Sequence, residues 1–228
     1  LRKAGKPPYR QDSGMRPQTV NADCRATDNT VNFPAAILQP PFFDPQADDA
    51  VNYGGIGAVI GHEMMHGYDD KGSQFDAQGN NANWWTQDDR EKFEARTALL
   101  GAQFDAYEPL PGLHINGALT MGENIADLGG ITIAYDALQL AQAAQPRAAA
   151  RKIDGYTPAQ RFFLNWARVW RGQSRPEALR VQIASNPHAP ERYRAIAAPS
   201  NLPAFAAAFA CKAGDTMVRA GDKQVKIW

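Results

Sequence analysis

The sequence predicts an α+β protein that is mostly helical and carries a small sheet near its N-terminus. Apolar residues recur with the 3.6-residue period of a helix through much of the chain after residue 53. Two short segments rich in β-branched residues precede that part and flank a turn-forming Asp28-Asn29 pair. With 228 residues, 44% of them hydrophobic, the chain is long enough to bury a sizeable core. We therefore expect one continuous domain over residues 17–228.

The first elements along the chain are a lead-in and a β-hairpin. Residues 1–16 are polar and contain Pro7 and Pro8, which is typical of a connector. Thr19-Val20-Asn21 and Thr30-Val31-Asn32-Phe33 are the two expected strands of the hairpin, and the Asp28-Asn29 pair forms its turn.

The first expected helix runs from Tyr53 to Gly67, because Ile56, Val59, Ile60 and Met64 have helical spacing. Four glycines lie inside this segment, and each costs about 1 kcal/mol in a helix interior. Close packing or an active site therefore requires them.

Four more helices follow, and three of them begin with capping signals. The second begins at Thr86, the third covers residues 121–144, and the last two begin at Thr157-Pro158-Ala159-Gln160 and Ser174-Arg175-Pro176-Glu177. Aromatic residues on one face of the fourth helix are expected in the core: Phe162, Phe163 and Trp166.

The charges balance, with 24 basic residues against 24 acidic ones. A protein without a net field has no general means of concentrating nucleic acid or an anionic membrane surface, so nucleic-acid partners are excluded. No apolar stretch reaches the roughly 18 residues of a membrane span. Cys24 and Cys211 permit one disulfide but not a fold built on disulfides.

His62-Glu63-Met64-Met65-His66 is the most informative segment of the chain. Residues four apart lie on one face of a helix, so both imidazoles can bind one tetrahedral zinc ion while Glu63 stands beside the open coordination position. The pattern arises by chance in about one chain in five hundred of this composition. The alternative is an ordinary amphipathic helix that carries two histidines.

A third zinc ligand is expected at Glu123, within Gly122-Glu123-Asn124-Ile125-Ala126-Asp127. The spacing from Thr120 to Glu123 is equally that of a helix-capping box. Asp127 favours the ligand, because it follows one turn later on the same face and could orient a ligand histidine. Asp69, three residues after His66, could orient the other histidine.

These motifs, together with others in the same order, resemble the catalytic C-terminal part of neprilysin-type zinc metallopeptidases. The group includes neutral endopeptidase, endothelin-converting enzyme and bacterial oligopeptidases. The resemblance covers nearly all of residues 15–228, and its further motifs are Val20-Asn21-Ala22, residues 33–43, Asn52-Tyr53-Gly54-Gly55-Ile56-Gly57, Trp84-Trp85 and the terminal Trp228.

The resemblance implies a thermolysin-like zinc peptidase core that hydrolyses oligopeptides on the amino side of hydrophobic residues. It implies one zinc ion held by His62, His66 and Glu123, and Glu63 as the general base that assists attack by a zinc-bound water. Asp127 and Asp69 would then orient the ligand histidines, with Asp127 counted among the catalytic residues.

Further site residues follow from the resemblance alone. His188 would stabilise the tetrahedral oxyanion and Arg194 would hold a substrate carbonyl, although a loop histidine and an arginine are by default exposed surface groups. The peptide backbone would pair with Asn21 and Ala22, and the hydrophobic pocket would contain Ile37, Phe42, Val59 and Trp170. The remaining histidine, His114, corresponds to no ligand position and is expected to be structural.

Two features depart from the family pattern. Asp23-Cys24 stands where aromatic residues usually follow the Asn-Ala edge, so the reach of that edge into the substrate groove is open. Family members also have a large N-terminal half that covers the active site. We therefore expect that half to be a partner of this chain, and this chain to be an excised fragment with weak or no activity. Without its partner, the fragment would expose apolar surface and is expected to self-associate.

Two other classes of function are open: a zinc-binding but inactive interaction module, and a structural helical domain without metal. The presence of Glu63 disfavours the module. High Ala and Arg usage suggests a bacterial source, where such enzymes are commonly exported, so a periplasmic or extracellular location is expected.

Overall fold

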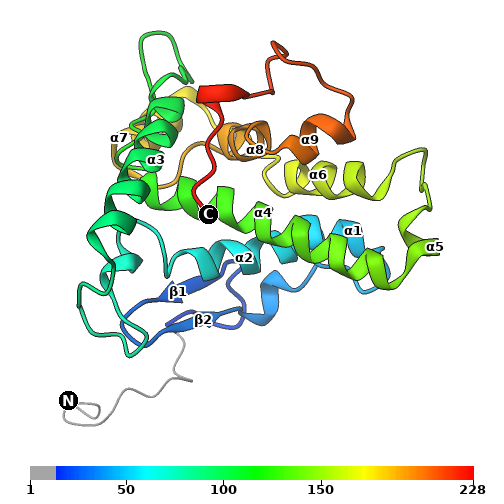
Figure 1. Ribbon diagram of the computed structural model, residues 1–228, viewed down its shortest axis with the longest axis horizontal. Helices are drawn as coiled ribbons and strands as arrows, with labels where there is room; N and C mark the ends of the chain where they lie inside the picture. Colours follow the sequence, from blue (N-terminus) through cyan, green and yellow to red (C-terminus); the bar gives the residue numbers. More distant parts are fainter. Residues whose placement is uncertain (1–13) are drawn as a thin grey trace.

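The computed structural model describes residues 14–228 and has the mostly helical α+β fold that the sequence predicts (Figure 1). Most of the expected lead-in, residues 1–13, lies outside this part. Nowhere in the described part is a helix both long and apolar enough to cross a membrane. The elements are β1 (Asp23–Arg25), β2 (Thr30–Asn32), α1 (Asp49–Asn52), α2 (Ala58–Met65), α3 (Gln87–Asp105), α4 (Met121–Ala144), α5 (Pro146–Ala149), α6 (Pro158–Val169), α7 (Pro176–Ser185), α8 (Glu191–Ser200) and α9 (Pro203–Ala208).

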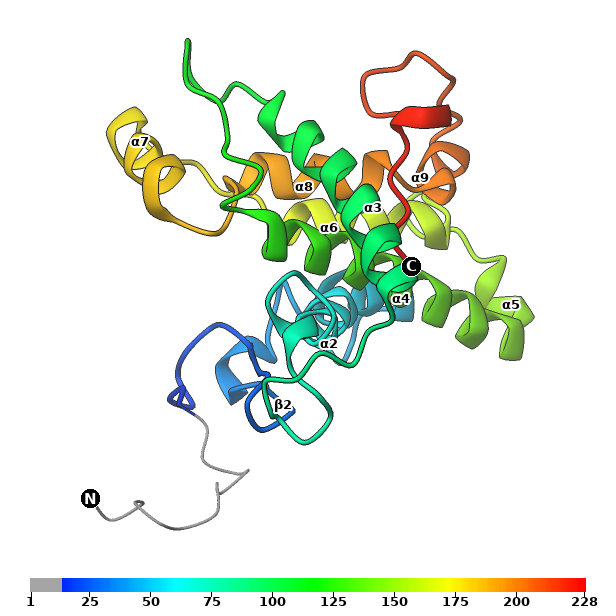
Figure 2. The same cartoon turned by 60° about the vertical axis from the view of Figure 1, so that its left-hand side comes forward.

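The long helix α4 lies at the centre of the molecule. The hairpin and α2 lie on one side of it, whereas α3, α6 and α8 lie on the other (Figure 1, Figure 2). The core forms around α4, and its most deeply buried side chains are Leu100, Ile125, Ile131, Leu138, Phe162 and Trp166. The aromatic face expected for the fourth helix is therefore confirmed on α6, with Phe163 also buried.

The hairpin exists, but its first strand lies later than the sequence predicts. The expected strand at residues 19–21 is wrong, because β1 pairs antiparallel with β2 in the register Asp23 to Asn32. The side chain of Asn32 donates a 2.6 Å hydrogen bond to Asp23, which fixes this register across the pair. Asn29 closes the turn with a positive φ of 51°, a conformation that asparagine tolerates. The β-branched Thr19 and Val20 favour an extended conformation at residues 19–21 as well. A strand forms only where a partner strand is available, and here the partner pairs with residues 23–25.

The helix that carries the two histidines is longer than expected and changes its winding. It begins at α1, passes through a π-helical stretch over Tyr53–Gly57 and continues as α2. A Cβ atom at Gly54 would lie 2.1 Å from the carbonyl oxygen of Phe162, and one at Gly55 would lie 2.4 Å from that of Phe42. Gly54 and Gly55 are thus required by backbone contacts with α6 and the loop after the hairpin, whereas the expectation is wrong for Gly57, where a Cβ atom would meet no heavy atom closer than 3.5 Å.

A pair of glycines brings α2 and α4 into backbone contact. A Cβ atom at Gly61 would lie 2.7 Å from the carbonyl oxygen of Gly130, and one at Gly130 would lie 2.5 Å from the amide nitrogen of His62. A Cβ atom does not approach another heavy atom this closely, so neither position accepts a larger residue without a shift of the helices. The contact sets the spacing between the two helices that carry the predicted metal ligands.

The capping signals predict two helix starts correctly and one incorrectly. Thr86 accepts a hydrogen bond from the amide of Asp89 at α3, and Thr157 and Gln160 form a complete capping box at α6. At α7 the residue that precedes the helix is Arg175 rather than Ser174, and its side chain makes no capping hydrogen bond. Pro176 is the first helical residue, and its fixed φ suffices to start the helix.

We expect Gly130→Ala to lower the free energy of unfolding by about 1–3 kcal/mol, because the added methyl group overpacks the α2–α4 contact. Zinc affinity should fall together with stability, since the shift separates α2 from α4. Gly57→Ala is the matched control, because a Cβ there meets no heavy atom closer than 3.5 Å. Chemical denaturation and zinc titration of both variants test this, and a Gly130→Ala protein of parental stability and affinity would contradict it.

Candidate metal centre

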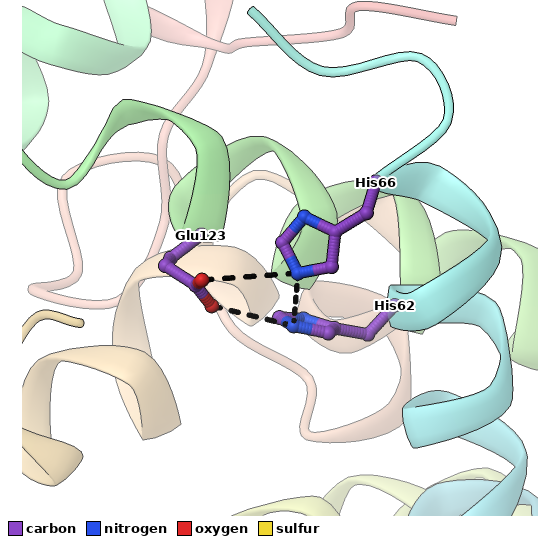
Figure 3. A group of neighbouring side chains, drawn as sticks. All are labelled: His62, His66 and Glu123. Carbon is purple, nitrogen blue, oxygen red and sulfur yellow. Dashed lines mark hydrogen bonds and ion pairs between the residues drawn. The ribbon is translucent and has the colours of Figure 1, made fainter. Parts of the chain in front are cut away.

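Three side chains from α2 and α4 converge on one point (Figure 3). The Nε2 atoms of His62 and His66 lie 3.0 Å apart. The carboxylate of Glu123 faces both, with Oε2 3.3 Å from the Nε2 of His62 and Oε1 3.8 Å from that of His66. The three residues are a group that could hold a metal ion, with ligand atoms all within 4.8 Å of one another.

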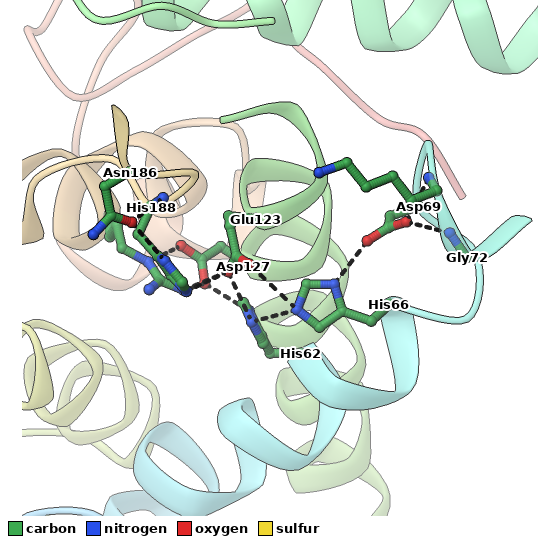
Figure 4. Close-up of polar contacts among 10 residues, drawn as sticks. His62, His66, Asp69, Gly72, Glu123, Asp127, Asn186 and His188 are labelled. Atoms are coloured by element: carbon green, nitrogen blue, oxygen red, sulfur yellow. Dashed lines mark hydrogen bonds and ion pairs between the residues drawn. The ribbon is translucent and has the colours of Figure 1, made fainter. Parts of the chain in front are cut away.

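The other ring nitrogen of each histidine is bound to a carboxylate (Figure 4). Nδ1 of His62 donates to Asp127 at 2.8 Å, and Nδ1 of His66 donates to Asp69 at 2.7 Å. Asp69 is itself held by the backbone amides of Lys71 and Gly72, at 2.8 and 2.7 Å. Nδ1 therefore carries a proton in both rings, and the two Nε2 atoms, which face each other, are left to bind a cation or a further proton.

This arrangement fits zinc. Facing lone pairs repel unless a cation or a proton lies between them. Glu123 Oε2 is a buried oxygen that lies within ion-pair distance of His62 and His188, although no described residue gives it a well-formed hydrogen bond. Two atoms bound at about 2.0–2.1 Å to a tetrahedral zinc ion are about 3.3 Å apart, which is close to the spacings seen here. Two imidazoles and one carboxylate are also a common ligand set of catalytic zinc.

The capping-box alternative for Glu123 is not what the structure shows. Thr120 makes no side-chain capping bond to α4. Its hydroxyl instead donates to the carbonyl oxygen of Asn116 and accepts from the side chain of Asn124. Glu123 is therefore free to face the two histidines.

Charged neighbours keep the carboxylates of this cluster ionised. Burial opposes ionisation of Glu123, but the adjacent His188, His62 and Arg194 hold its pKa well below its usual range. Burial likewise opposes ionisation of Asp127, and Arg194 lowers the pKa of that carboxyl below its ordinary value. Both groups therefore offer anionic oxygens to cations at neutral pH.

Arg194 is buried and held in place, unlike the usual arginine, which is exposed on the surface. From α8 it donates two 2.7 Å hydrogen bonds to Asp127, through Nε and Nη2. Its guanidinium lies 3.8 Å from the centre of the Trp170 ring. A chain of contacts thus runs from Trp170 through Arg194 and Asp127 to His62.

His188 reaches the same centre from the loop between α7 and α8 (Figure 4). Its Nε2 lies 3.2 Å from Glu123 Oε2, although the side chain is 45% exposed. Its Nδ1 lies 2.9 Å from Oδ1 of Asn186. His188 is therefore not a loop histidine that contacts only solvent. Asn186 was not expected at the site, and the only signal for it is the asparagine two residues before His188, the spacing of an Asx-turn.

All residues that the sequence assigns to the site line one cleft of about 590 Å³. The hydrophobic positions Ile37, Phe42, Val59 and Trp170 form part of its wall, and Asn21 and Ala22 lie where the chain enters β1. Other lining residues are not among those that the sequence assigns to the site: Asp23, Cys24, Lys71, Phe75 and Trp166, the last of which was expected in the core. His114 lies outside the lining and contacts the carbonyl oxygen of Asp105 instead.

Glu63 lies in this cleft beside the two histidines and is only 5% exposed. It makes no hydrogen bond with another residue of the described part, and burial raises the pKa of its carboxyl. A carboxylate that is buried, unpartnered and open to a cleft is a suitable proton acceptor.

Both cysteines are free and half-buried, so the disulfide that the sequence permits does not form here. Burial, followed by the charges of Glu63 and Asp69, raises the pKa of Cys24 to about 11. The Cys24 thiol is therefore a weak nucleophile at neutral pH.

Comparison with known proteins supplies relatives for almost the whole chain. The family described as Peptidase family M13 matches residues 21–225. An endothelin-converting enzyme homologue of Locusta migratoria is 40% identical over 95% of this chain and 30% of its own length. Neprilysin-1 of Caenorhabditis elegans is 46% identical over 87% of this chain and 27% of its own length. The chain therefore spans less than a third of these relatives.

A solved structure is similar at the level of the fold. The crystal structure of a Mycobacterium tuberculosis zinc metalloprotease in complex with an inhibitor superposes with a TM-score of 0.94 at 47% sequence identity. The superposition covers 98% of this chain and 35% of that one.

Glu123→Ala should lower zinc affinity by about two orders of magnitude or more, because it removes one of three protein ligands. The matched control is Glu177→Ala, which removes an equivalent first-turn glutamate from α7. Loss of that side chain should leave zinc affinity unchanged and cost at most about 1 kcal/mol of stability. Competition with a fluorescent zinc chelator measures both, and superimposable titrations would exclude Glu123 as a ligand.

Zinc binding to the metal-free protein should release a proton from His62. Burial lowers the pKa of this imidazole, but its bonds to Asp127 and Glu123 outweigh burial and raise it to about 9. Below that pH the ring carries a proton that zinc must displace, so apparent affinity should rise about tenfold per pH unit between 7 and 9. Calorimetry in buffers of different ionisation enthalpy counts the protons released, and a pH-independent affinity would contradict the assignment.

Proposed function

Because this chain belongs to peptidase family M13, we propose that it forms the zinc-dependent catalytic part of an endopeptidase that cleaves oligopeptides on the amino side of hydrophobic residues. One observation carries the proposal. Two imidazole lone pairs and a carboxylate converge beside a second, unpartnered carboxylate, Glu63, in one cleft. This combination provides both a metal site and a base.

His62, His66 and Glu123 would hold the zinc ion. When bound, zinc would lower the pKa of a water molecule toward about 7 and polarise a peptide carbonyl group. Asp127 and Asp69 keep the proton of each ligand histidine on Nδ1 and hold each Nε2 in place.

Glu63 would accept the proton of the attacking water and pass it to the leaving amine. Its burial favours this role, because a raised pKa brings a carboxylate closer to the pH at which it exchanges protons efficiently. Glu63 is not tied to a neighbouring residue of the described part, so its carboxylate is available to a water in the cleft.

His188 and Arg194 would act on the peptide carbonyl groups. His188 Nε2 points at the metal centre from the side opposite α2, where it can donate to an oxygen that develops negative charge (Figure 4). Arg194 is held by Asp127 and Trp170 while it lines the cleft, so it offers a fixed donor to a second carbonyl group.

The substrate backbone would pair with the chain at Asn21 and Ala22. These two residues lie directly before β1 and line the cleft, so their backbone groups are placed to pair with an extended peptide. Main-chain pairing of this kind discriminates little between peptide sequences. Selectivity would come from the pocket formed by Ile37, Phe42, Val59 and Trp170. A pocket lined by these side chains favours an apolar residue after the scissile bond.

We also propose that further polypeptide covers this cleft in the intact protein, which would act in the periplasm or outside the cell. The relatives are more than three times longer than this chain. An apolar side chain of the cleft lining, Val20, is 53% exposed, and Tyr68 and Trp84 are 48% and 47% exposed outside the cleft, as surfaces that another segment covers would be. The location rests on the family alone.

Metal analysis combined with peptide cleavage tests the proposal. Stoichiometric zinc and chelator-sensitive cleavage before Phe or Leu are expected, with much slower cleavage before Asp. Zinc without cleavage by the intact protein would indicate an inactive interaction module, and absence of stoichiometric zinc would indicate a structural domain.

Glu63→Gln should reduce turnover by about 100-fold to 10,000-fold and leave zinc bound, because it removes proton transfer but no ligand. Glu94→Gln, an exposed change on α3, is the matched control. Cleavage rates and zinc content measured on the same samples decide the outcome. Turnover within tenfold of the parent would refute the role of Glu63.

A further inference from the structure

A charged residue, Asp23, lines the cleft beside the proposed path of the peptide. It is the first residue of β1 and directly follows Asn21 and Ala22, which would pair with the substrate backbone. β1 lies beside α2, which carries the proposed base Glu63 (Figure 1). Burial is the main cause of the raised pKa of the Glu63 carboxyl, and the charge of Asp23 adds to it. Asp23 is therefore close to the reacting groups.

The course of the chain decides which end of a peptide Asp23 would meet. Ala22 belongs to the same hydrophobic cluster as the pocket residues Ile37 and Val59, and Val59 lies near the start of α2. Cys24 lines the cleft and also a neighbouring hollow at the other end of α2, which contains none of the pocket residues. The chain thus leads away from the pocket after Ala22. A peptide whose residue after the scissile bond fills the pocket directs its preceding residues toward Asp23.

The carboxylate of Asp23 is anchored through one oxygen only. Its Oδ1 accepts a 2.6 Å hydrogen bond from the side chain of Asn32 across the hairpin. The other oxygen is accessible and has no hydrogen-bond or ion-pair partner within residues 14–228. Arg25, two residues along the same strand, forms an ion pair with Asp28 at 3.4 Å. A fixed anion with one open oxygen loses little freedom on binding a cationic group.

The cleft also contains a cation, Lys71, but the two charges do not pair. Lys71 lies in the loop after α2, where its backbone amide donates to Asp69. Its side chain is exposed and forms no ion pair with a carboxylate of the described part. An exposed lysine on a long, flexible stem must be ordered before it can select a ligand, whereas Asp23 is already held. The anchored charge therefore determines the preference of this part of the cleft.

We propose that Asp23 is a specificity-determining residue that binds an arginine or lysine side chain of the substrate, at one of the two residues before the scissile bond. The inference rests on the proposed function and adds to it a selection on the amino side of the cleaved bond. Successive residues of an extended chain are about 3.3 Å apart, so a long basic side chain can reach Asp23 from either position.

Matched peptides test the inference in the intact, zinc-loaded protein. Each peptide has Phe after the scissile bond and either arginine or its neutral isostere citrulline at one of the two preceding positions. At the favoured position, kcat/KM should be about 5-fold to 30-fold higher for arginine, because a charge-assisted hydrogen bond is stronger than a neutral one. The difference should shrink as the salt concentration rises.

Asp23→Asn separates the charge from the structural bond, because its amide oxygen can still accept from Asn32. It should lower kcat/KM for the arginine peptide at least fivefold more than for the citrulline peptide. Asp222→Asn is the matched control, since it makes the same change at an exposed residue outside the cleft. The control should retain the parental preference for arginine.

Three results would overturn the inference while leaving zinc-dependent cleavage intact. They are equal cleavage of the two peptides by the parent, an equal loss for both peptides in Asp23→Asn, and a preference for glutamate, which would assign the selection to Lys71. Absence of any chelator-sensitive cleavage would instead count against the proposed function.

A binding measurement then decides the inference without hydrolysis. Fluorescence anisotropy of the labelled peptides with the zinc-loaded Glu63→Gln protein should show at least fivefold tighter binding of the arginine peptide. Adding Asp23→Asn should remove that difference, and equal affinities before this change would overturn the inference.

Discussion

The contact between the backbones of α2 and α4 is the constraint on which the site depends. Side chains from two helices can share one ion only if the helices approach closely, and Gly61 and Gly130 permit that approach. The crossing places His62 one residue from the contact on α2 and sets Glu123 and Asp127 opposite it on α4. The packing of glycine against glycine, which contributes little hydrophobic energy itself, thereby determines the positions of the polar groups.

Most charges of the buried polar cluster have a partner. Asp127 lies between His62 and Arg194, and Asp69 lies between His66 and two backbone amides. Glu63 makes no side-chain hydrogen bond within the described part of the chain, Glu123 Oε2 has only longer ion-pair contacts, and both residues face the cleft. Several carboxylates gathered in a buried site are costly, and a divalent cation is the species that would relieve that cost. The unsatisfied groups are thus concentrated where chemistry is expected.

The sequence predicts local features well and interactions across the fold less well. The helix expected at residues 121–144 and the starts of α3 and α6 depend on nearby residues, and the structure confirms these predictions. The first strand was displaced because residues 19–21 and 23–25 can both be extended, and only the partner Asn32 selects between them. The two histidine ligands followed from helical spacing, but the burial of Arg194 against Asp127 and the approach of His188 to Glu123 involve groups that are far apart in the sequence. Neither contact corresponds to a period or spacing that could be recognised in the sequence.

The short length of β1 has a consequence for the behaviour of the protein in solution. A strand edge that accepts a peptide can also accept another protein chain, which is a common route to aggregation. Here β1 is only three residues long, and two of them, Asp23 and Arg25, carry charge. A short, charged edge can form few hydrogen bonds with any one chain, so an association without further contacts would be weak and reversible. The strand that would align a peptide is therefore also poorly suited to nucleating a fibril.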